Sequence, residues 1–432
     1  MSQTQPVLNK DGFIQQCDTI DVAMTTIWIS ARCVLPLTDY SEVINNIKSL
    51  LPETLQKHFQ LRLSIKTDKR GAKMFSYCSQ ESLTFDSLVI ETKWPDTELV
   101  DLDNIKYKFV DSKPPYEALF KLRICQNEKN KKIALRLDIA HTLADGHSIF
   151  EILNIFAQIS QGIKDDCKPV YKIHEFGHTD LYDKICLEES LKGHPKSWDE
   201  IPKGNIFKKV STPNKMENII YDYDMKKIRK ILNKYNISVQ GLMNAISSRA
   251  FRKYFNLNNK EKVGIFCPTN TRKLKWSTEI NKTPFFTSSG GNFITVEGQD
   301  DLETDLKHCY LKLQNCVKSM DPIMQTLIVA RFMDKDTLKY DKVDTEMPAQ
   351  TTHYIITTSN IGNIQKIIKN CDDFLFLMVY KTTDESYGVG TYVYYDDNVF
   401  RVTQLFVSTF DRKYLKCIEE EFNLIMNLAD KI

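Results

Sequence analysis

The sequence predicts a mixed α/β protein built from two units of similar size. Segments with the alternating apolar pattern of strands and segments with the apolar spacing of helices are interspersed along the whole chain. The length of 432 residues also exceeds what one hydrophobic core usually serves. Hydrophobic residues make up 42% and charged residues 26% of the chain, without a low-complexity tract, so we expect it to fold throughout.

The first half is expected to form a sheet with two main helices. Asp39 is placed to cap a helix whose apolar face includes Val43 and Ile47. Residues 148–160 are apolar at nearly every position, which is typical of a helix buried on most sides. The strands expected in this half are 20–35, 59–66, 73–78, 118–125 and a half-buried strand at 131–140.

A change of composition separates the two halves. From about residue 161 to 215 the apolar periodicity gives way to Pro, Gly, Lys and Asp, a pattern that is uncommon inside one compact domain. We therefore assign residues 1–175 to an N-terminal domain, 176–215 to a crossover linker and 216–432 to a C-terminal domain.

The second half opens with two consecutive helices, for which Asp224 and Ser238 are the expected caps. A strand at 263–268 then leads to Arg272. The elements expected after it are a strand following Asn292, a helix from about 301, strands at 352–363, 374–380, 388–395 and 399–407, and a last helix from Asp411.

Charge and cysteine content limit the partners and the compartment. The net charge is +2 and the basic residues are spread along the chain, so no nucleic-acid partner is expected. Eleven cysteines without a Cys-x-x-Cys pair or a secretory leader indicate reduced thiols in the cytoplasm. The longest apolar stretch, Val22–Leu37, is interrupted by Arg32 and Pro36, so no transmembrane segment is expected; peripheral membrane association is left open.

The clearest chemical signal lies at residues 139–147, which read IAHTLADGH. His141 continues the apolar parity of the preceding strand, so its imidazole is expected to point inward. The turn at Asp145-Gly146 lies where the strand passes into a helix. An inward histidine at the end of a strand is suited to act as a positioned base.

With later landmarks, this stretch resembles the chloramphenicol acetyltransferase-like superfamily, which includes plant-type acyltransferases, condensation domains and fungal alcohol acetyltransferases. Its signature His-x-x-x-Asp-Gly matches His141 to Gly146, after a strand and before a helix. The later landmarks follow in family order: 268–272 resembles the strand-end segment that carries an arginine, Gly291-Asn292 a Gly-Asn turn, and 359–362 the Ser-Asn-x-Gly turn of the alcohol acetyltransferase branch.

Two departures separate the chain from the other branches. The Asp-Phe-Gly-Trp-Gly motif of plant-type members is absent, and residues 385–390 stand in that neighbourhood. Ala140 occupies the position of the second histidine that condensation domains usually carry. The alcohol acetyltransferase branch is therefore the one that the chain resembles most.

The resemblance implies two similar domains, each a mixed sheet with flanking helices, that meet at a substrate tunnel. It implies a monomer that transfers an acyl group from acyl-coenzyme A, a co-substrate, to a small-molecule alcohol or amine, with no bound cofactor or metal. His141 would be the general base of a ternary-complex mechanism. Asp145 would pair with Arg272 to hold the histidine loop, and Gly146 would allow close approach. The oxyanion-stabilising candidates, each of which could instead cap a turn, are Asn292, Ser359 and Asn360.

Two alternatives stay open. His174-Glu175-x-x-His178 satisfies the zinc-peptidase pattern, although it follows Pro169 in a polar stretch and includes Gly177. The chain could also be a binding protein that keeps the fold without turnover. Loss of activity in a His141 variant would favour the acyltransferase, and sensitivity to a chelator would favour the zinc hydrolase.

Overall fold

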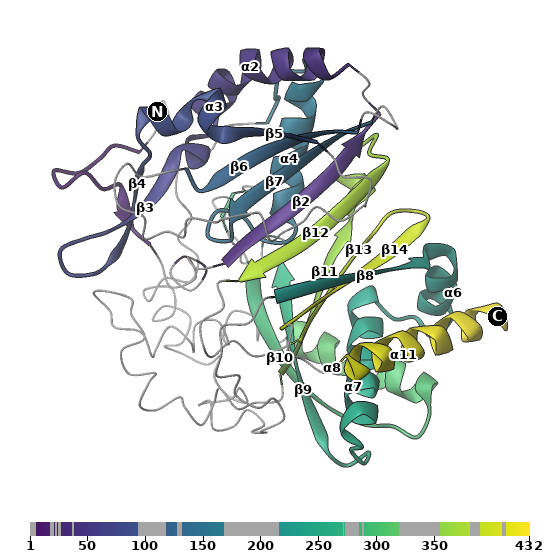
Figure 1. The fold of residues 1–432 in the computed structure, drawn as a ribbon. Helices are drawn as coiled ribbons and strands as arrows, with labels where there is room; N and C mark the ends of the chain where they lie inside the picture. The colour runs from purple at the N-terminus through teal and green to yellow at the C-terminus, as the bar shows by residue number, and fades with distance from the viewer. Residues whose placement is uncertain are drawn as a thin grey trace.

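The fold is known from a computed structural model. It describes residues 6–17, 21, 24, 27–36, 39–93, 118–127, 132–167, 216–270, 272, 285–286, 289–318, 355–380, 389–407 and 412–432. These residues form three sheets with helices packed on them, so the predicted mixed α/β class is confirmed (Figure 1). The predicted linker at 176–215 and the zinc-peptidase pattern lie outside the described residues.

A five-stranded sheet organises the first half, and it includes a strand from the second half. Its order is β12-β2-β7-β6-β5, antiparallel throughout except for the parallel pair β5 and β6. β12 lies along β2, with Leu375 opposite Arg32 (Figure 1). The bounds are β2 Ile27–Leu35, β5 Val89–Lys93, β6 Phe120–Asn127, β7 Lys132–Ala140 and β12 Asp373–Tyr380.

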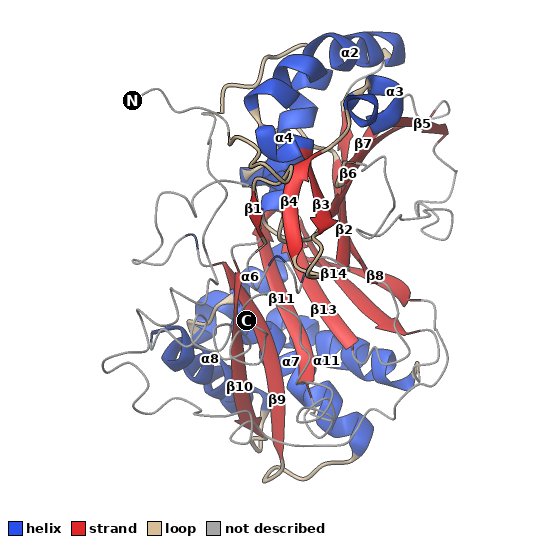
Figure 2. Ribbon diagram, turned by 90° about the vertical axis from the view of Figure 1, so that its left-hand side faces the viewer, coloured by secondary structure: helices blue, strands red, loops and turns tan. Residues whose placement is uncertain are grey.

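Helices α2 (Tyr40–Lys57) and α4 (Ser148–Ser160) lie on one side of this sheet (Figures 1 and 2). The predicted cap is confirmed, because Asp39 Oδ1 accepts the N–H of Glu42 at 3.0 Å. The remaining small elements are α3 (Phe85–Leu88), η2 (Gln80–Leu83) and a three-stranded sheet of β1 (Gln15–Gln16), β4 (Lys73–Tyr77) and β3 (Leu63–Thr67).

Two predictions for the first half are wrong in part. The strand expected at 59–66 begins only at Leu63, because residues 59–62 form the 3₁₀ helix η1 (Phe59–Arg62), in which Leu61 N–H donates to His58 O. The strand at 131–140 is not half-buried: every residue of β7 after Lys132 is buried. Arg136 and Asp138 pair with each other at 2.7 Å on the face that was expected to meet solvent.

A six-stranded sheet organises the second half, in the order β10-β9-β11-β13-β14-β8. β11 runs parallel to both β9 and β13, and the other pairs are antiparallel. The bounds are β8 Met216–Asp224, β9 Lys262–Asn270, β10 Ser289–Glu297, β11 Ile355–Asn363, β13 Val389–Tyr395 and β14 Val399–Val407, with a 3₁₀ helix η7 (Ile364–Lys366) after β11.

Four helices gather against this sheet: α6 (Met225–Tyr235), α7 (Val239–Phe255), α8 (Leu302–Lys318) and α11 (Lys413–Asp430) (Figure 1). Both predicted caps are confirmed, since Asp224 accepts from the N–H of Lys226 and Ser238 from that of Gly241. α6 and α7 end at Asn236 and Asn256, both in the left-handed conformation that asparagine tolerates.

The two halves share a core. One buried cluster contains first-half residues together with β12 and with Ile361 and Tyr394 of the second half. A second cluster lies between the six-stranded sheet and its helices. Because β12 belongs to the first cluster, the strand that crosses between halves is anchored by apolar burial as well as by its hydrogen bonds.

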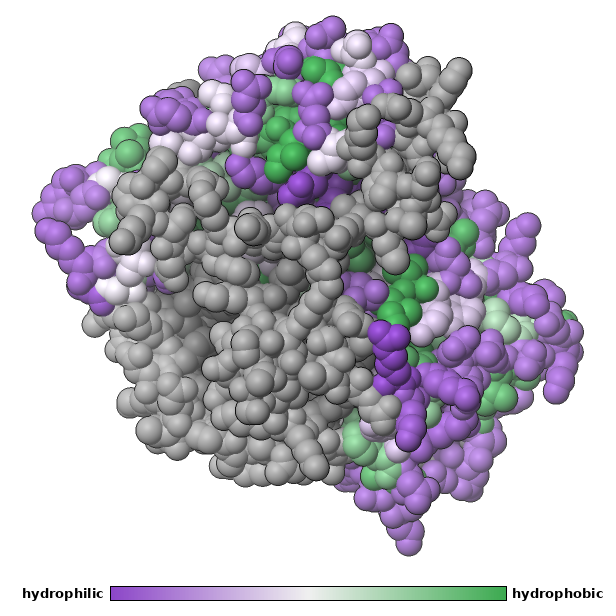
Figure 3. Space-filling model, viewed as in Figure 1, coloured by the Kyte–Doolittle hydropathy of each residue, from purple (hydrophilic) through white to green (hydrophobic). Residues whose placement is uncertain are grey.

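The described surface offers little apolar area. Among the residues coloured in Figure 3, hydrophilic side chains predominate on this face and apolar ones form small separate groups. No helix in the described part of the chain is long and apolar enough to span a bilayer. Apart from the adjacent Val7 and Leu8, the exposed large apolar residues of the described chain are far apart in the sequence: Ile163, Leu311, Leu424 and Ile432.

Candidate active site

His141 is the first residue after β7, and the sheet holds its backbone in place. Its N–H donates to Ile27 O of the neighbouring strand β2 at 2.8 Å. The residue is only 9% exposed. Burial lowers the pKa of the imidazole, against the opposing influence of its own backbone and of the Asp145 carboxylate. The ring is therefore neutral at neutral pH, the form that accepts a proton.

Asp145 joins the histidine loop (residues 141–147) to helix α4. One carboxylate oxygen, Oδ1, accepts the N–H groups of His147 at 3.1 Å and Ser148 at 2.9 Å. In return the Asp145 N–H donates to Ser148 Oγ at 2.8 Å. Placing a carboxylate on free N–H groups at a helix N-terminus is favourable, and it fixes the turn between strand and helix.

The other oxygen of Asp145, Oδ2, forms an ion pair with Arg272 Nη1. Both side chains are more than nine-tenths buried. Arg272 also donates to Phe286 O at 2.6 Å, and Phe286 forms a parallel bridge with Ala144 inside the loop. The pair that the resemblance implies is thus present, and it fastens the histidine loop to a segment of the second half.

Gly146 lies where two strands of the second half approach the loop. A Cβ at this position would come within 3.3 Å of Ile361 Cγ1 on β11 and 3.7 Å of Phe376 Cζ on β12. The absence of a side chain therefore serves close packing of protein against protein. The resemblance implied close approach at this position, and the groups that approach it here are the Ile361 and Phe376 side chains.

The later landmarks lie within strands, so the two predicted turns are wrong. Residues 359–362 belong to β11, where the register to β13 shifts between Asn360 and Gly362, a bulge that Gly362 accommodates at φ +113°. Gly291 and Asn292 belong to β10 and lie opposite Pro268 and Cys267. The side chain of Asn292 is outside the described part of the structure.

Helix α7 holds the backbone of Asn360. The Asn360 N–H donates to Gln240 Oε1 at 3.0 Å, and its buried Oδ1 accepts no hydrogen bond from the residues that the structure describes. Gln240 Nε2 also donates to Thr358 Oγ1 at 2.8 Å and to Asn244 Oδ1 at 2.9 Å. Sequence reasoning missed this polar network. Its signal was two amides at i and i+4, followed on the same helix face by Ser247 and Ser248.

His147 closes the loop and contacts both halves. Its Nδ1 lies 3.3 Å from Ile361 O, and its Nε2 lies 3.6 Å from Glu151 Oε1 one turn into α4. The nearby Glu151 carboxylate raises the pKa of His147, with burial opposing and Asp145 adding to the increase. This histidine is therefore cationic to a higher pH than an exposed one.

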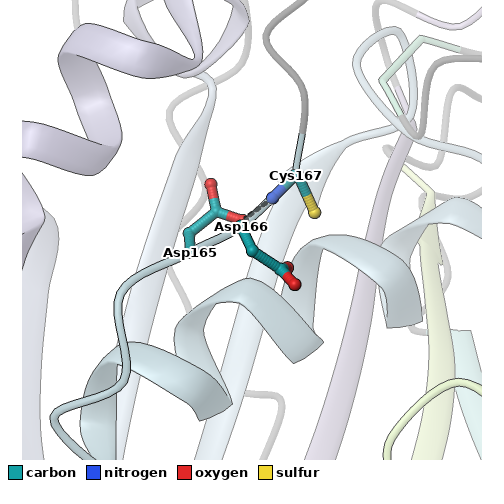
Figure 4. A group of neighbouring side chains, drawn as sticks. All are labelled: Asp165, Asp166 and Cys167. Carbon is teal, nitrogen blue, oxygen red and sulfur yellow. Dashed lines mark hydrogen bonds between the residues drawn. The ribbon is translucent and has the colours of Figure 1, made fainter.

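Asp165, Asp166 and Cys167 form a compact group after α4 that has the donor types of a metal site (Figure 4). The Asp165 carboxylate is already bound by His58 and by Lys57 at 3.3 Å. Burial raises the pKa of Asp165, but the hydrogen bonds from His58 and the Cys167 N–H lower it by more. The net result is a pKa well below the usual range of an aspartate. Burial and Asp165 raise the pKa of Cys167 to about 12, which disfavours the thiolate that a metal requires.

We therefore interpret this group as an anchor that ties the end of the first half to α2, and not as a metal centre.

No family model and no curated protein matches the sequence. Solved structures do match. Polyketide synthase associated protein 5 from Mycobacterium tuberculosis has a TM-score of 0.66 at 11% identity, covering 97% of this chain and 99% of that chain. Trichothecene 15-O-acetyltransferase from Fusarium sporotrichioides has a TM-score of 0.67 at 12% identity, covering 98% and 97%. This chain has the chloramphenicol acetyltransferase-like fold.

The first condensation domain of the calcium-dependent antibiotic synthetase matches as well, with a TM-score of 0.64 at 10% identity over 99% of this chain and 96% of that chain. At such identities the comparison establishes the fold, and the chemistry must come from the residues. In this chloramphenicol acetyltransferase-like fold, His141 directly follows a central strand of the first sheet, while Arg272 reaches its loop from the second half.

Proposed function

We propose that this protein is an acyltransferase that moves an acyl group, in the simplest case acetyl, from a coenzyme A thioester to a small-molecule alcohol or amine. The observation that carries the proposal is the buried imidazole of His141, whose pKa burial lowers, on a loop fixed to both halves. The fold, which an acetyltransferase and condensation domains share, agrees with transfer of an acyl group.

In the proposed reaction His141 removes the proton of the acceptor hydroxyl or amine as that group attacks the thioester carbonyl. The resulting tetrahedral oxyanion collapses, and the carbon–sulfur bond breaks. The imidazolium then protonates the departing thiolate, which gives coenzyme A and returns His141 to its neutral form. Both substrates are present together, and no acyl-enzyme is formed.

Asp145 and Arg272 have a positioning role in this proposal. The carboxylate spans from the N-terminus of α4 to Arg272, so it fixes the backbone that carries His141. Asn292, Ser359 and Asn360 remain the candidates for stabilising the oxyanion. Among them Asn360 has the most defined support, because Gln240 holds its backbone from α7.

The test is release of free thiol from acetyl-coenzyme A with a panel of alcohols and amines. We expect His141→Ala to lower turnover by about 10²–10⁴-fold, the usual contribution of a general base. His308→Ala, a half-buried histidine on α8, is the control and should retain activity. Full activity in the His141 variant would overturn the proposal.

The same assay separates the two alternatives. A zinc hydrolase would lose activity in the presence of a chelator and in Glu175→Ala, with His141→Ala unaffected. A binding protein would bind coenzyme A in a titration without releasing thiol from its acyl form. The assignment to a cytoplasmic monomer rests on the sequence and belongs to the same proposal.

A further inference from the structure

β11 carries one extra residue where it pairs with β13. Asn360 lies opposite Val393, and Gly362 lies opposite the next residue, Tyr394, so Ile361 between them has no partner on β13. An extra residue of this kind is a β-bulge, which is rare between parallel strands such as these. A bulge turns the side chain of its extra residue in a new direction, and here that residue is Ile361.

Ile361 turns both its side chain and its carbonyl toward the histidine loop. Its Cγ1 lies 3.3 Å from the position that a Cβ of Gly146 would occupy, and its carbonyl oxygen lies 3.3 Å from His147 Nδ1. The side chain is buried in the core of the first half, although β11 belongs to the sheet of the second half. The histidine loop therefore packs against the bulge itself, and its position depends on the shape of the bulge.

Gln240 of helix α7 holds the strand just before the bulge. Its Oε1 accepts the N–H of Asn360 at 3.0 Å. The amide nitrogen of Gln240 is fixed in turn, because it donates to Asn244 Oδ1 at 2.9 Å and to the Thr358 carbonyl at 3.2 Å. Asn244 and Thr358 are fully buried, so water does not compete for these hydrogen bonds. The helix thus presents one acceptor in a defined place to the backbone of β11.

Gly362 completes the bulge on the other side of Ile361. Its φ is +113°, a conformation that residues with a side chain rarely adopt. A Cβ on Gly362 would meet no described atom within 4 Å, so the position needs glycine for its backbone and not for space. The bulge is therefore specified from both sides, by a hydrogen bond before Ile361 and by a glycine after it.

We propose that Gln240 is a positioning residue of the candidate active site. By holding the backbone of β11, it sets the bulge so that Ile361 packs on Gly146 and accepts a hydrogen bond from His147, and in this way it fixes the loop that carries His141. Gln240 acts through β11 and not on the reacting groups. Its effect on turnover rests on the proposed acyl transfer, whereas its effect on the histidine loop does not.

Gln240→Met keeps the length of the side chain and removes its hydrogen bonds. We expect turnover of acetyl-coenzyme A to fall by about 10–10²-fold, because a displacement of the base by about 1 Å has an effect of that size. The loss should fall on kcat and leave the apparent KM for acetyl-coenzyme A nearly unchanged, since a displaced base weakens the transition state and not the binding of the substrate.

Thr358→Val is the matched control within the same network. The Thr358 hydroxyl accepts from Gln240 Nε2 at 2.8 Å and donates to Asn244 Oδ1 at 2.7 Å, so this variant also removes two buried hydrogen bonds. It leaves Gln240 bonded to the carbonyl of residue 358 and to Asn360. Urea unfolding should show comparable losses of stability for the two variants, whereas turnover should stay near that of the wild type in the control. Equal losses of turnover in both variants would overturn the proposal.

The pKa of His147 gives a readout that does not depend on turnover. Glu151 contributes most to raising it, and the Ile361 carbonyl adds to the increase. Gln240→Met should therefore lower this pKa, and Thr358→Val should leave it unchanged, as measured by NMR titration with the signal assigned by its loss in His147→Gln. If the wild type releases no thiol with any acceptor, the proposed function fails, and this titration still decides the role of Gln240. A pKa of His147 that did not move in Gln240→Met would overturn that role.

Gly362→Ala tests the bulge from its other side and covers the case in which Gln240→Met does not fold. The variant should lower both turnover and the pKa of His147, because the left-handed backbone that the bulge requires becomes strained. Gly12→Ala is its control: it places a methyl group at φ +81°, also in open space, in the turn before β1, and should retain both values. A Gly362→Ala protein that behaved like Gly12→Ala would show that the bulge does not set the loop, and the proposal would fall.

Discussion

The histidine loop carries two histidines, and their surroundings give them opposite properties. His141 is buried after a sheet strand, so burial lowers its pKa. His147, six residues later, meets Glu151 and the Ile361 carbonyl, and its pKa is raised. One short loop thus holds two imidazoles whose pKa values are shifted in opposite directions. The comparison teaches that the local partners, and not the residue type, decide which histidine can act as a base.

Asp145 lies between the two histidines and acts on both, since its charge raises each pKa. The largest effect in this comparison should therefore come from Asp145→Asn. It removes the negative charge that faces the buried Arg272 guanidinium, and breaking such a pair costs about 3–5 kcal/mol. Urea unfolding should show that loss, and NMR titration should show lower pKa values for both histidines.

The control for Asp145→Asn is Asp166→Asn, which removes an exposed carboxylate and should change the free energy of unfolding by under about 0.5 kcal/mol. A double-mutant cycle with Arg272→Met isolates the ion pair from the capping role of Asp145. If Asp145→Asn cost less than about 1 kcal/mol, the pair would not be holding the loop.

A smaller effect is expected from Gly146→Ala, which tests the contact between the loop and β11. The new methyl group would lie 3.3 Å from Ile361 Cγ1, tighter than ordinary packing. Overpacking of this kind costs about 1–3 kcal/mol. Ile361→Ala removes the contacting carbons, so the double variant should be more stable than the sum of the single changes predicts, as measured by urea unfolding. If the two free-energy changes simply added, the contact between residue 146 and Ile361 would not be the cause of the destabilisation.

The features that could be predicted from the sequence are those fixed by residues close by in the chain. The caps at Asp39, Asp224 and Ser238 depend on hydrogen bonds within three residues, and all three are present. The histidine loop was recognisable for the same reason, as one contiguous pattern between a strand and a helix.

Features that depend on distant partners were misread. β7 was expected to be half-buried because Arg136 and Asp138 alternate with apolar residues, yet Asp138 is neutralised by Arg136 and by Arg123 of β6. No local pattern indicates that β12 would join β2, or that the partner of Gln240 on α7 would be Asn360. Charge pairing and strand addition arise only in the folded chain, so a periodicity argument cannot detect them.

The smallest effect, and the one that most directly tests the contrast between the two histidines, is expected for His147→Gln. The folded pKa of His147 is raised above its ordinary value of 6.5, so its stabilisation is fully present below that pH and is lost as pH rises through the raised pKa. The charged groups that face it are Glu151 on α4 and Asp145 on the loop. Because the side chains of His147 and Glu151 are 23% and 38% exposed, the stabilisation should be at most about 1 kcal/mol.

The variant should therefore be less stable than wild type in urea at pH 6 and equally stable at pH 9. His141 predicts the opposite trend, because a lowered pKa gives stability that is present above 6.5 and lost as pH falls. A His147→Gln deficit that stayed constant across this range, or grew with pH, would mean that packing and not charge holds His147. The division of the loop into a base and a cation would then be wrong.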